Sequence, residues 1–293
     1  MNFPMGSELI VGDEKPLASK LAVVTGGAGG MGLAAARILG RDHSVLLSDI
    51  HREGVNAAAN ELRAAGVDCT ATVCDVTDQK SVTELARLAQ QLGPIGAIVH
   101  TAGVSPNMGS ADLILRINAV GTVLVNTAFY DIATTEMAVV NVASVAGHQL
   151  PTIIAPKRCY GRALSDLDRF HRDLLLMCNV APRRARPGLA YMLSKNFVIW
   201  FSKIMAANFG AKGARVLSVS PGSFDTPMGR LEERGAGTLV QLGALKRFGN
   251  PSEIAELLAF CAGDRAGYLT GTDIICDGGV MAAMRRRDLL RLA

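Results

Sequence analysis

The chain has 293 residues and a formal net charge of +4, with apolar side chains at 49% of its positions and aromatic ones at only 5%. This small charge, without basic patches interleaved with aromatic residues, argues against a nucleic-acid-binding surface, and no apolar run approaches the ~20 residues that span a membrane. The six cysteines form no C-x-x-C pair, which predicts free thiols in a reducing, cytoplasmic compartment and no metal site.

Short apolar runs alternate with helix-forming segments through the first half of the chain. Strands are expected at 21–25, 44–48, 70–74, 96–100 and 137–143. Helices are expected at 33–39, 53–65, 77–92 (capped by Thr77) and 113–129. Strands that are apolar throughout and alternate with helices predict a parallel sheet covered on both faces. With right-handed crossovers, the prediction is a Rossmann-type, doubly wound α/β fold.

The alternation breaks after Ser144 and resumes at Tyr191. In residues 148–188 no strand is expected, and apolar side chains recur at helical spacing at Leu164, Leu167, His171, Leu174, Leu175 and Cys178. We interpret this stretch as a helical insertion that either lines a substrate pocket or, equally, covers a sheet edge or blocks an oligomer surface. Beyond it we expect a helix at 191–209, a strand at 215–220, a helix at 252–262 and a strand at 273–276.

One domain, at residues 20–284, accounts for this organisation. An irregular extension at 1–19 precedes it, and a basic tail at 285–293 follows it. The tail is interpreted as a solvated chain end, with a contact to an acidic partner as the alternative. Residues 230–243, which include Gly235 and Gly237, are interpreted as a flexible lid.

A glycine-rich turn, Gly-Gly-Ala-Gly-Gly-Met-Gly, follows the first predicted strand. Gly26 and Gly30 permit unusual backbone angles and the close approach of a pyrophosphate, and the helix that starts after Gly32 aims its first amides at that anion. Asp49 ends the second strand, where an acidic side chain meets the adenosine ribose. Its charge would repel a 2′-phosphate, so NAD is expected rather than NADP, although Arg52 lies nearby. A helix cap is the alternative role for Asp49.

The dipeptide Asp75-Val76 ends the third predicted strand. At that edge of a parallel sheet it is placed to hydrogen-bond the adenine ring of a bound dinucleotide. An aspartate after a strand also commonly forms a turn with its own backbone. Both interpretations of Asp75 are equally consistent with the sequence.

Tyr191 and Lys195 lie four residues apart in a predicted helix, and side chains with that spacing project from one face. A free phenol titrates near ~10 and is a poor acid or base at neutral pH. A lysine ammonium one turn away favours the phenolate, so the pair predicts a general acid/base.

Together these features resemble the short-chain dehydrogenase/reductase family over nearly the whole chain. The matching segments are the glycine-rich turn, Asp75, Ala102-Gly103, Asn118, Ser144, Tyr191-x-x-x-Lys195, Pro221-Gly222 with Thr226, Leu269-Thr-Gly and Asp277-Gly-Gly. The resemblance implies an oxidoreductase that passes a hydride between a nicotinamide cofactor and a small carbonyl or alcohol substrate. It also implies a homodimer or homotetramer.

The resemblance further implies roles for individual residues. Tyr191 would exchange a proton with the substrate oxygen, and Lys195 would lower its pKa and bind the nicotinamide ribose. Ser144 would polarise the substrate oxygen, and Asn118 would hold a water of a proton relay. From the residues alone, each has a structural alternative. Ser144 could simply end a strand, and Asn118 could simply cap or kink a helix. The implied cofactor contacts are Gly26, Gly30, Met31, Asp49, Asp75, Val76, Ala102, Gly103, Tyr191, Lys195, Pro221, Gly222, Phe224 and Thr226.

The chain departs from the usual family pattern in two ways. The usual Asn-Asn-Ala-Gly is His-Thr-Ala-Gly here, and we interpret His100 as a hydrogen-bonded core histidine. The segment from Gly103 to Asn118 is shorter than in most members, and the gap from Ser144 to Tyr191 is far longer. This pairing resembles the bacterial 3α-hydroxysteroid dehydrogenase/carbonyl reductase branch.

The leading prediction is an NAD-dependent enzyme that interconverts a secondary alcohol and a ketone, on a bulky apolar or steroid-like substrate. A 3-oxoacyl reductase is the alternative among enzymes, and Asp49 argues against it because NADP is usual there. A non-catalytic, dinucleotide-sensing regulator is the alternative outside enzymes. The presence of Ser144, Tyr191 and Lys195 argues against the regulator.

Overall fold

Seven parallel strands form one sheet at the centre of the structure, a computed structural model that describes residues 20–150, 155–231 and 233–283. The strands are β1 (Leu21–Thr25), β2 (Ser44–Asp49), β3 (Cys69–Val73), β4 (Ile95–His100), β5 (Ala138–Val142), β6 (Arg215–Pro221) and β7 (Asp273–Cys276). Their order is β3-β2-β1-β4-β5-β6-β7. The order reverses between β1 and β4, where doubly wound sheets open a crevice for ligands. The predicted fold class is confirmed.

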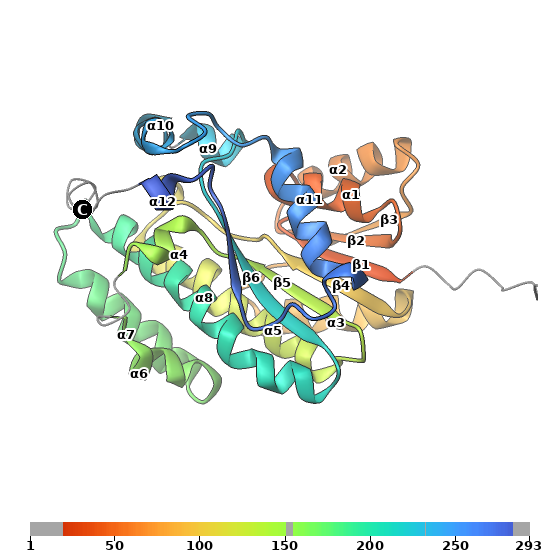
Figure 1. Ribbon diagram of the computed structural model, residues 1–293. Coiled ribbons are helices and arrows are strands. Elements are labelled where there is room, and N and C mark those ends of the chain that lie inside the picture. Colours follow the sequence, from red (N-terminus) through yellow and green to blue (C-terminus); the bar gives the residue numbers. More distant parts are fainter. Residues whose placement is uncertain (1–19, 151–154, 232, 284–293) are drawn as a thin grey trace, which may run out of the picture.

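Helices cover both faces of the sheet (Figure 1). One face carries α1 (Gly30–Leu39), α2 (Arg52–Ala64) and α11 (Pro251–Ala262). The other carries α3 (Gln79–Leu92), α4 (Ala111–Leu115), α5 (Gly121–Asp131), α7 (Leu167–Asn179) and α8 (Arg186–Ala211). Successive strand side chains alternate between the faces, so Leu21 and Val23 enter one apolar core and Ala22 and Val24 the other.

Several helix starts differ from their expected positions, and those of α3 and α8 bear on named residues. The side chain of Asp78, and not Thr77, caps α3 by accepting from the Lys80 N–H. Thr77 is instead held by Asp75, to which its backbone N–H and hydroxyl both donate at 2.8 Å. The helix α8 begins at Arg186 and so holds Tyr191 inside its second turn rather than at its end.

The predicted helix at 113–129 is a longer helix, Ala111–Asp131, with an irregular middle. A π-helical turn at Arg116–Val120 joins α4 to α5 and places Asn118 in its centre. Such turns widen the helix by one residue and are frequent at functional sites. Among the described helices, Ala111–Asp131 is the one long and apolar enough to cross a membrane, and it is a buried core helix.

The expected insertion at 148–188 contains a short helix α6 (Lys157–Tyr160), a 3-10 turn at Gly161–Leu164 and α7. The apolar stripe of α7 does not line a pocket. Phe170, Leu174 and Cys178 are buried in the core, and the Phe170 ring lies 4.6 Å from that of Phe197 on α8. Leu164 lies outside the stripe, in the 3-10 turn, and is half exposed. The stripe therefore covers α8.

The segment expected to be a flexible lid contains helices. They are α9 (Pro227–Leu231) and α10 (Glu233–Leu242), followed near the C-terminal end of the described chain by α12 (Val280–Ala283). The extension at 1–19 and the basic tail at 285–293 lie outside the described residues.

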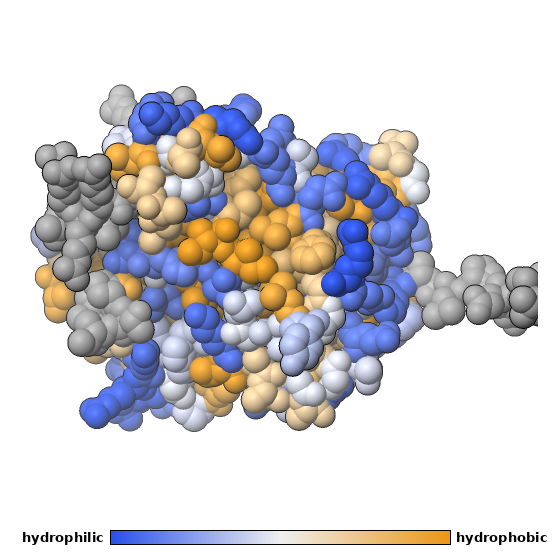
Figure 2. Space-filling model, viewed as in Figure 1, coloured by the Kyte–Doolittle hydropathy of each residue, from blue (hydrophilic) through white to orange (hydrophobic). Residues whose placement is uncertain are grey.

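An apolar surface accompanies the edge of the sheet at β7. The β7 strand pairs only with β6 among the described strands, and apolar side chains gather over it and beside α11 (Figure 2). Ile275 on β7 is 42% exposed and Phe260 on α11 is 41% exposed. We call the surface around these two residues the β7 face.

Candidate active site

A cleft of about 770 Å³ opens where β5 and β6 end. The hydroxyl-bearing residues Ser144 and Tyr191 both line it, and so does Met31 at the start of α1. After α7, the residues Ala181 and Pro182 complete one wall. None of the described residues that line the cleft has a charged side chain. The cleft therefore suits an uncharged substrate next to hydroxyl groups, among them those of Ser144 and Tyr191.

Ser144 is held in a tight turn that rests on α8. Its Oγ accepts a hydrogen bond from the Ala146 N–H at 3.2 Å, which starts the 3-10 turn Val145–His148. Gly147 in this turn touches the α8 backbone: an added Cβ would lie 2.7 Å from the carbonyl carbon of Lys195. The turn and the helix are therefore in direct backbone contact, which brings Ser144 and Tyr191 to one cleft.

A buried carboxylate ties the same turn to the end of the sheet. His148 Nε2 lies 2.8 Å from Asp273 Oδ2. The other oxygen of Asp273 accepts from the hydroxyls of Ser218 at 2.5 Å and Ser220 at 3.0 Å. His148 and Asp273 were not predicted from the sequence, because they lie 125 residues apart and belong to no local motif.

Lys195 is almost fully buried, at 6% exposure. Its Nζ donates to the carbonyl oxygen of Val142 at 2.9 Å and lies 5.8 Å from the centre of the Tyr191 ring. Burial penalises the charged form and lowers the pKa of Lys195 to about 8. The predicted pairing of Tyr191 with Lys195 is thus present in space.

Asn118 reaches across to the loop after β4. Its Oδ1 accepts from the Val104 N–H and its Nδ2 donates to the Val104 carbonyl, both at 2.9 Å. Gly103 gives both polar groups room: an added Cβ there would lie 3.1 Å from Asn118 Oδ1 and 3.4 Å from Lys195 Nζ. The structure therefore brings Asn118 and Lys195 to the same short stretch of backbone.

His100 is a hydrogen-bonded core histidine, as interpreted from the sequence. It is 2% exposed, and its ring nitrogens lie 2.8 Å from Thr25 Oγ1 and 3.2 Å from Thr122 Oγ1. Burial, with the nearby positive charge of Lys195, lowers the pKa of His100 to about 3. The ring is neutral throughout the physiological range.

The glycine-rich turn has the shape of a phosphate cradle. Gly26 has φ +68°, and an added Cβ would lie 2.7 Å from Ala102 Cα. Gly30 also has a positive φ, of +55°, and faces Thr226. Gly29 precedes α1 without a side-chain cap, and no acidic residue lies in the first helical turn. The first amides of α1 therefore suit an anionic ligand, and the turn fits the pyrophosphate of a dinucleotide.

Asp49 and Asp75 differ in how the structure engages them. The Asp49 carboxylate accepts from the Ala28 N–H and from the His51 N–H, both at 3.1 Å, so its charge lies beside the glycine-rich turn. Asp75 forms a turn with Thr77, as the second of its two interpretations predicted. Val76 is 7% exposed and lies in the core, which leaves its backbone for any cofactor contact.

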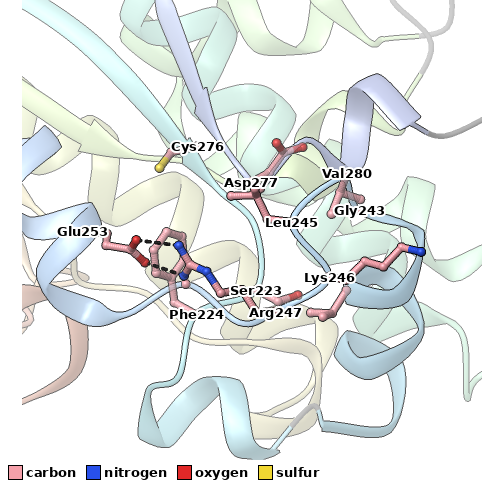
Figure 3. Close-up of a pocket in the computed structure, with 13 residues that line it drawn as sticks. Ser223, Phe224, Gly243, Leu245, Lys246, Arg247, Glu253, Cys276, Asp277 and Val280 are labelled. Carbon is pink, nitrogen blue, oxygen red and sulfur yellow. Dashed lines mark hydrogen bonds and ion pairs between the residues drawn. The ribbon is translucent and has the colours of Figure 1, made fainter.

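A second, smaller cavity lies beside the loop after β6 (Figure 3). This cavity measures about 110 Å³. Ser223 and Phe224 line both spaces, and an ion pair between Arg247 and Glu253, at 2.7 and 2.9 Å, borders the smaller one. The small cavity cannot hold a substrate together with a dinucleotide.

The remaining predicted contacts lie around this loop. The Gly222 N–H donates to the Cys276 carbonyl at 2.9 Å. Thr226 is 6% exposed, and its Oγ1 accepts from the Gly229 N–H at 3.0 Å. Both residues line the large cleft together with Pro221 and Phe224. The predicted nicotinamide contacts are thus gathered at one wall.

Comparisons with known proteins agree with this architecture. The family pattern described as short chain dehydrogenase matches residues 20–156, and the one described as Enoyl-(Acyl carrier protein) reductase matches residues 174–281. Short-chain dehydrogenase/reductase bsc3 of Alternaria brassicicola is 30% identical over 92% of this chain and 98% of that protein. Cis-4-hydroxycyclohexanecarboxylate dehydrogenase of Sinomonas cyclohexanicum is 30% identical over 90% of this chain and 98% of that one.

Solved structures share the fold. The actinorhodin polyketide ketoreductase, crystallised with NADPH, superposes with a TM-score of 0.70 at 23% identity, over 89% of this chain and 97% of that one. The fold, the two family patterns and relatives that match along nearly their whole length lead to one conclusion: the chain belongs to the short-chain dehydrogenase/reductase family of oxidoreductases.

Proposed function

We propose that this oxidoreductase is NAD-dependent and interconverts a secondary alcohol and a ketone. The observation that carries the proposal is one uncharged cleft lined by the hydroxyls of Ser144 and Tyr191, with the buried Lys195 beside the Tyr191 ring. A nicotinamide cofactor, when bound, supplies or accepts the hydride. The glycine-rich turn and the loop from Pro221 to Thr226 would hold it.

The side chains divide the remaining work among them. Tyr191 gives a proton to the substrate oxygen in ketone reduction and removes it in alcohol oxidation. Ser144 hydrogen-bonds the same oxygen and polarises it, and the Lys195 ammonium favours the phenolate form of Tyr191. Asn118 holds the backbone at Val104 and contributes to a relay with Lys195. Proton transfer by a positioned side chain such as Tyr191 typically contributes ~10²–10⁴-fold to a rate.

Replacing Tyr191 with Phe tests the assignment. We expect turnover to fall by ~10²–10⁴-fold, because the proton donor is lost, while NADH binding stays within about twofold of wild type. Tyr268→Phe is the matched control, since Tyr268 is fully exposed and away from the cleft. The measurements are NADH absorbance for turnover and NADH fluorescence for binding. Unchanged turnover in Tyr191→Phe would sink the assignment.

The preference for NAD rests on Asp49. Its carboxylate lies beside the glycine-rich turn, where a 2′-phosphate would meet a like charge. We expect Asp49→Ala to lower the ratio of kcat/KM with NAD to kcat/KM with NADP by about tenfold or more. Loss of the Ala28 contact weakens both cofactors alike, so the ratio isolates the charge effect. A ratio equal to that of wild type would contradict the ribose contact.

For the substrate, we propose a bulky apolar alcohol or ketone, such as a cyclic or steroid-like one. The support is the uncharged lining of the cleft, whose volume of about 770 Å³ would be shared with the nicotinamide. The name of one relative, cis-4-hydroxycyclohexanecarboxylate dehydrogenase, supports a cyclic secondary alcohol, although that substrate also carries a carboxylate. A panel of cyclohexanols, hydroxysteroids and 3-oxoacyl thioesters distinguishes this proposal from the 3-oxoacyl reductase alternative. Tight NADH binding without any turnover would favour the regulator alternative.

The likeness to the 3α-hydroxysteroid dehydrogenase/carbonyl reductase branch belongs to the same proposal. It is supported by the helical segment at 148–188, whose final part lines the cleft at Ala181 and Pro182. Turnover of a 3α-hydroxysteroid would favour this branch. We further propose a cytoplasmic homo-oligomer, in keeping with six free cysteines and the exposed β7 face.

A further inference from the structure

A buried chain of hydrogen bonds joins the glycine-rich turn to Asn118 through His100. His100 is the last residue of β4 and lies directly beside Thr25, the last residue of β1. Nδ1 of His100 is 2.8 Å from Thr25 Oγ1, and Nε2 is 3.2 Å from Thr122 Oγ1. The Thr122 hydroxyl in turn donates to the Asn118 carbonyl oxygen at 2.7 Å.

The donor and the acceptor of each hydrogen bond in this series can be assigned. A threonine hydroxyl carries a single hydrogen, and Thr122 gives its hydrogen to Asn118, so it can only accept from His100. The hydrogen between them therefore belongs to Nε2 of His100. In a neutral imidazole the other nitrogen is then bare, and Nδ1 accepts the hydroxyl hydrogen of Thr25. This arrangement requires the Nε2–H tautomer.

We propose that His100 is a positioning residue of the reaction: it sets the π-helical turn around Asn118 relative to the glycine-rich turn that begins after Thr25. The inference rests on the proposed function. His100 touches neither cleft nor cofactor and acts through two threonines. Asn118 is then held from both sides, by Thr122 at its carbonyl and by Val104 at its side chain.

An imidazole suits this task better than the asparagine usual at this position of the family. Its two nitrogens point to different sides of a ring, toward Thr25 and Thr122, whereas an amide carries both polar atoms at one end. The π-helical turn also needs such support, because its backbone is less regular than that of an α-helix. The pKa of about 3 keeps the ring neutral and the direction of the bonds unchanged.

The first test is the tautomer. Nitrogen-15 NMR of the whole protein, with His100→Asn used to assign the signal among five histidines, reports which ring nitrogen is protonated. We expect Nε2–H with bare Nδ1 between pH 5 and 8. An Nδ1–H tautomer, or a ring that protonates within that range, would overturn the proposed direction of the bonds.

The second test is kinetic and uses a matched pair at Thr122. Thr122→Val removes the hydroxyl at nearly constant volume, whereas Thr122→Ser keeps it. We expect kcat to fall by about ten- to a hundredfold in Thr122→Val, with KM and the Kd of NADH within about twofold of wild type, and Thr122→Ser to retain most of kcat. We expect His100→Asn to lower kcat in the same way, with KM and the Kd of NADH nearly unchanged. It replaces Thr122→Val in this test if that variant does not fold.

The outcomes separate this inference from the proposed function. Equal kcat in wild type, Thr122→Val and His100→Asn would overturn the positioning role while leaving the enzyme assignment intact. A rise in KM with unchanged kcat would overturn it as well. Absence of wild-type turnover on the whole alcohol and ketone panel would instead overturn the proposed function, and the tautomer measurement would still decide the bonding of His100.

Discussion

Burial of the Lys195 side chain links its charge to the pH of the solution. The pKa of Lys195 is lowered to about 8 from the ordinary value of 10.5, so the ammonium is present below about pH 8 and lost above it. Ketone reduction needs both this charge and the Tyr191 proton. We therefore expect kcat/KM for ketone reduction to fall as pH rises through about 8, as measured by initial rates from pH 6 to 10.

The contribution of Lys195 to stability changes with pH in the opposite direction to the rate. A loss of activity at high pH can therefore be told apart from unfolding caused by this group. Between the folded value of about 8 and the unfolded value of 10.5, the unfolded chain binds more protons at Lys195. The contribution of this group to the free energy of unfolding therefore rises with pH in that window. A rate that stays constant up to pH 10 would contradict the prediction, provided that the protein remains folded.

The residues of the site were predictable to different degrees. Tyr191 and Lys195 form a local pattern, so their proximity follows from helical spacing alone. The pair of His148 and Asp273 was not predictable, because a contact between residues 125 positions apart leaves no periodic signal. The tautomer of His100 likewise depends on two threonines brought to it by β1 and the helix after the π turn.

At the scale of the element, Arg215 secures the end of α11. Its buried guanidinium donates to the carbonyl oxygens of Cys261, Gly263 and Leu269 at 3.0, 2.9 and 3.1 Å. These carbonyls lie at and beyond the last turn of the helix, where no intrahelical donor is available. We expect Arg215→Met to lower the free energy of unfolding by ~3 kcal/mol, as measured by urea denaturation, because it leaves buried acceptors unpaired.

Arg41, in the turn after α1, provides the matched control because it also contacts α11. It forms an exposed ion pair with Glu256 of α11 at 3.1 Å, and exposed pairs contribute only ~0–1 kcal/mol. Arg41→Met should therefore change stability by less than about 1 kcal/mol. Equal losses in the two variants would show that burial of Arg215 has no special effect.

Strands were easier to predict than helix irregularities. The strands β1, β2 and β4 are recognisable in the sequence as continuous apolar runs, because a parallel sheet is buried on both faces. The π turn at Arg116–Val120 has no such signal in the sequence. It differs from an α-helix only in which backbone carbonyl accepts the hydrogen bond from each backbone N–H. The helices α9 and α10 were also missed, because glycines favour a loop while contacts with neighbouring helices favour a helix.

At the scale of the whole molecule, the β7 face is an apolar surface that the described residues of a single copy leave open. The β7 face combines a strand edge that pairs with no other described strand with the exposed Ile275 and Phe260, and such edges tend to be covered. We expect the chain of 30.8 kDa to form a dimer or tetramer, with Ile275→Lys lowering the mass measured by light scattering.

A second charged substitution serves as the control. Leu176 is 63% exposed on α7, on a helix that does not border the β7 face. Leu176→Lys should leave the measured mass unchanged. A monomeric wild type would contradict the expected oligomer, and equal effects of both substitutions would show that the contact lies elsewhere.

The glycine contact between the Ser144 turn and α8 has a consequence for how the enzyme tolerates change. Since Gly147 rests on the α8 backbone itself, main-chain atoms set the spacing between the two hydroxyl-bearing elements. Substitutions in the two apolar cores can then raise or lower the stability of the fold without changing that spacing. Core residues can therefore change during evolution without disturbing the site. A single methyl group added at position 147, in contrast, would push Tyr191 away from Ser144.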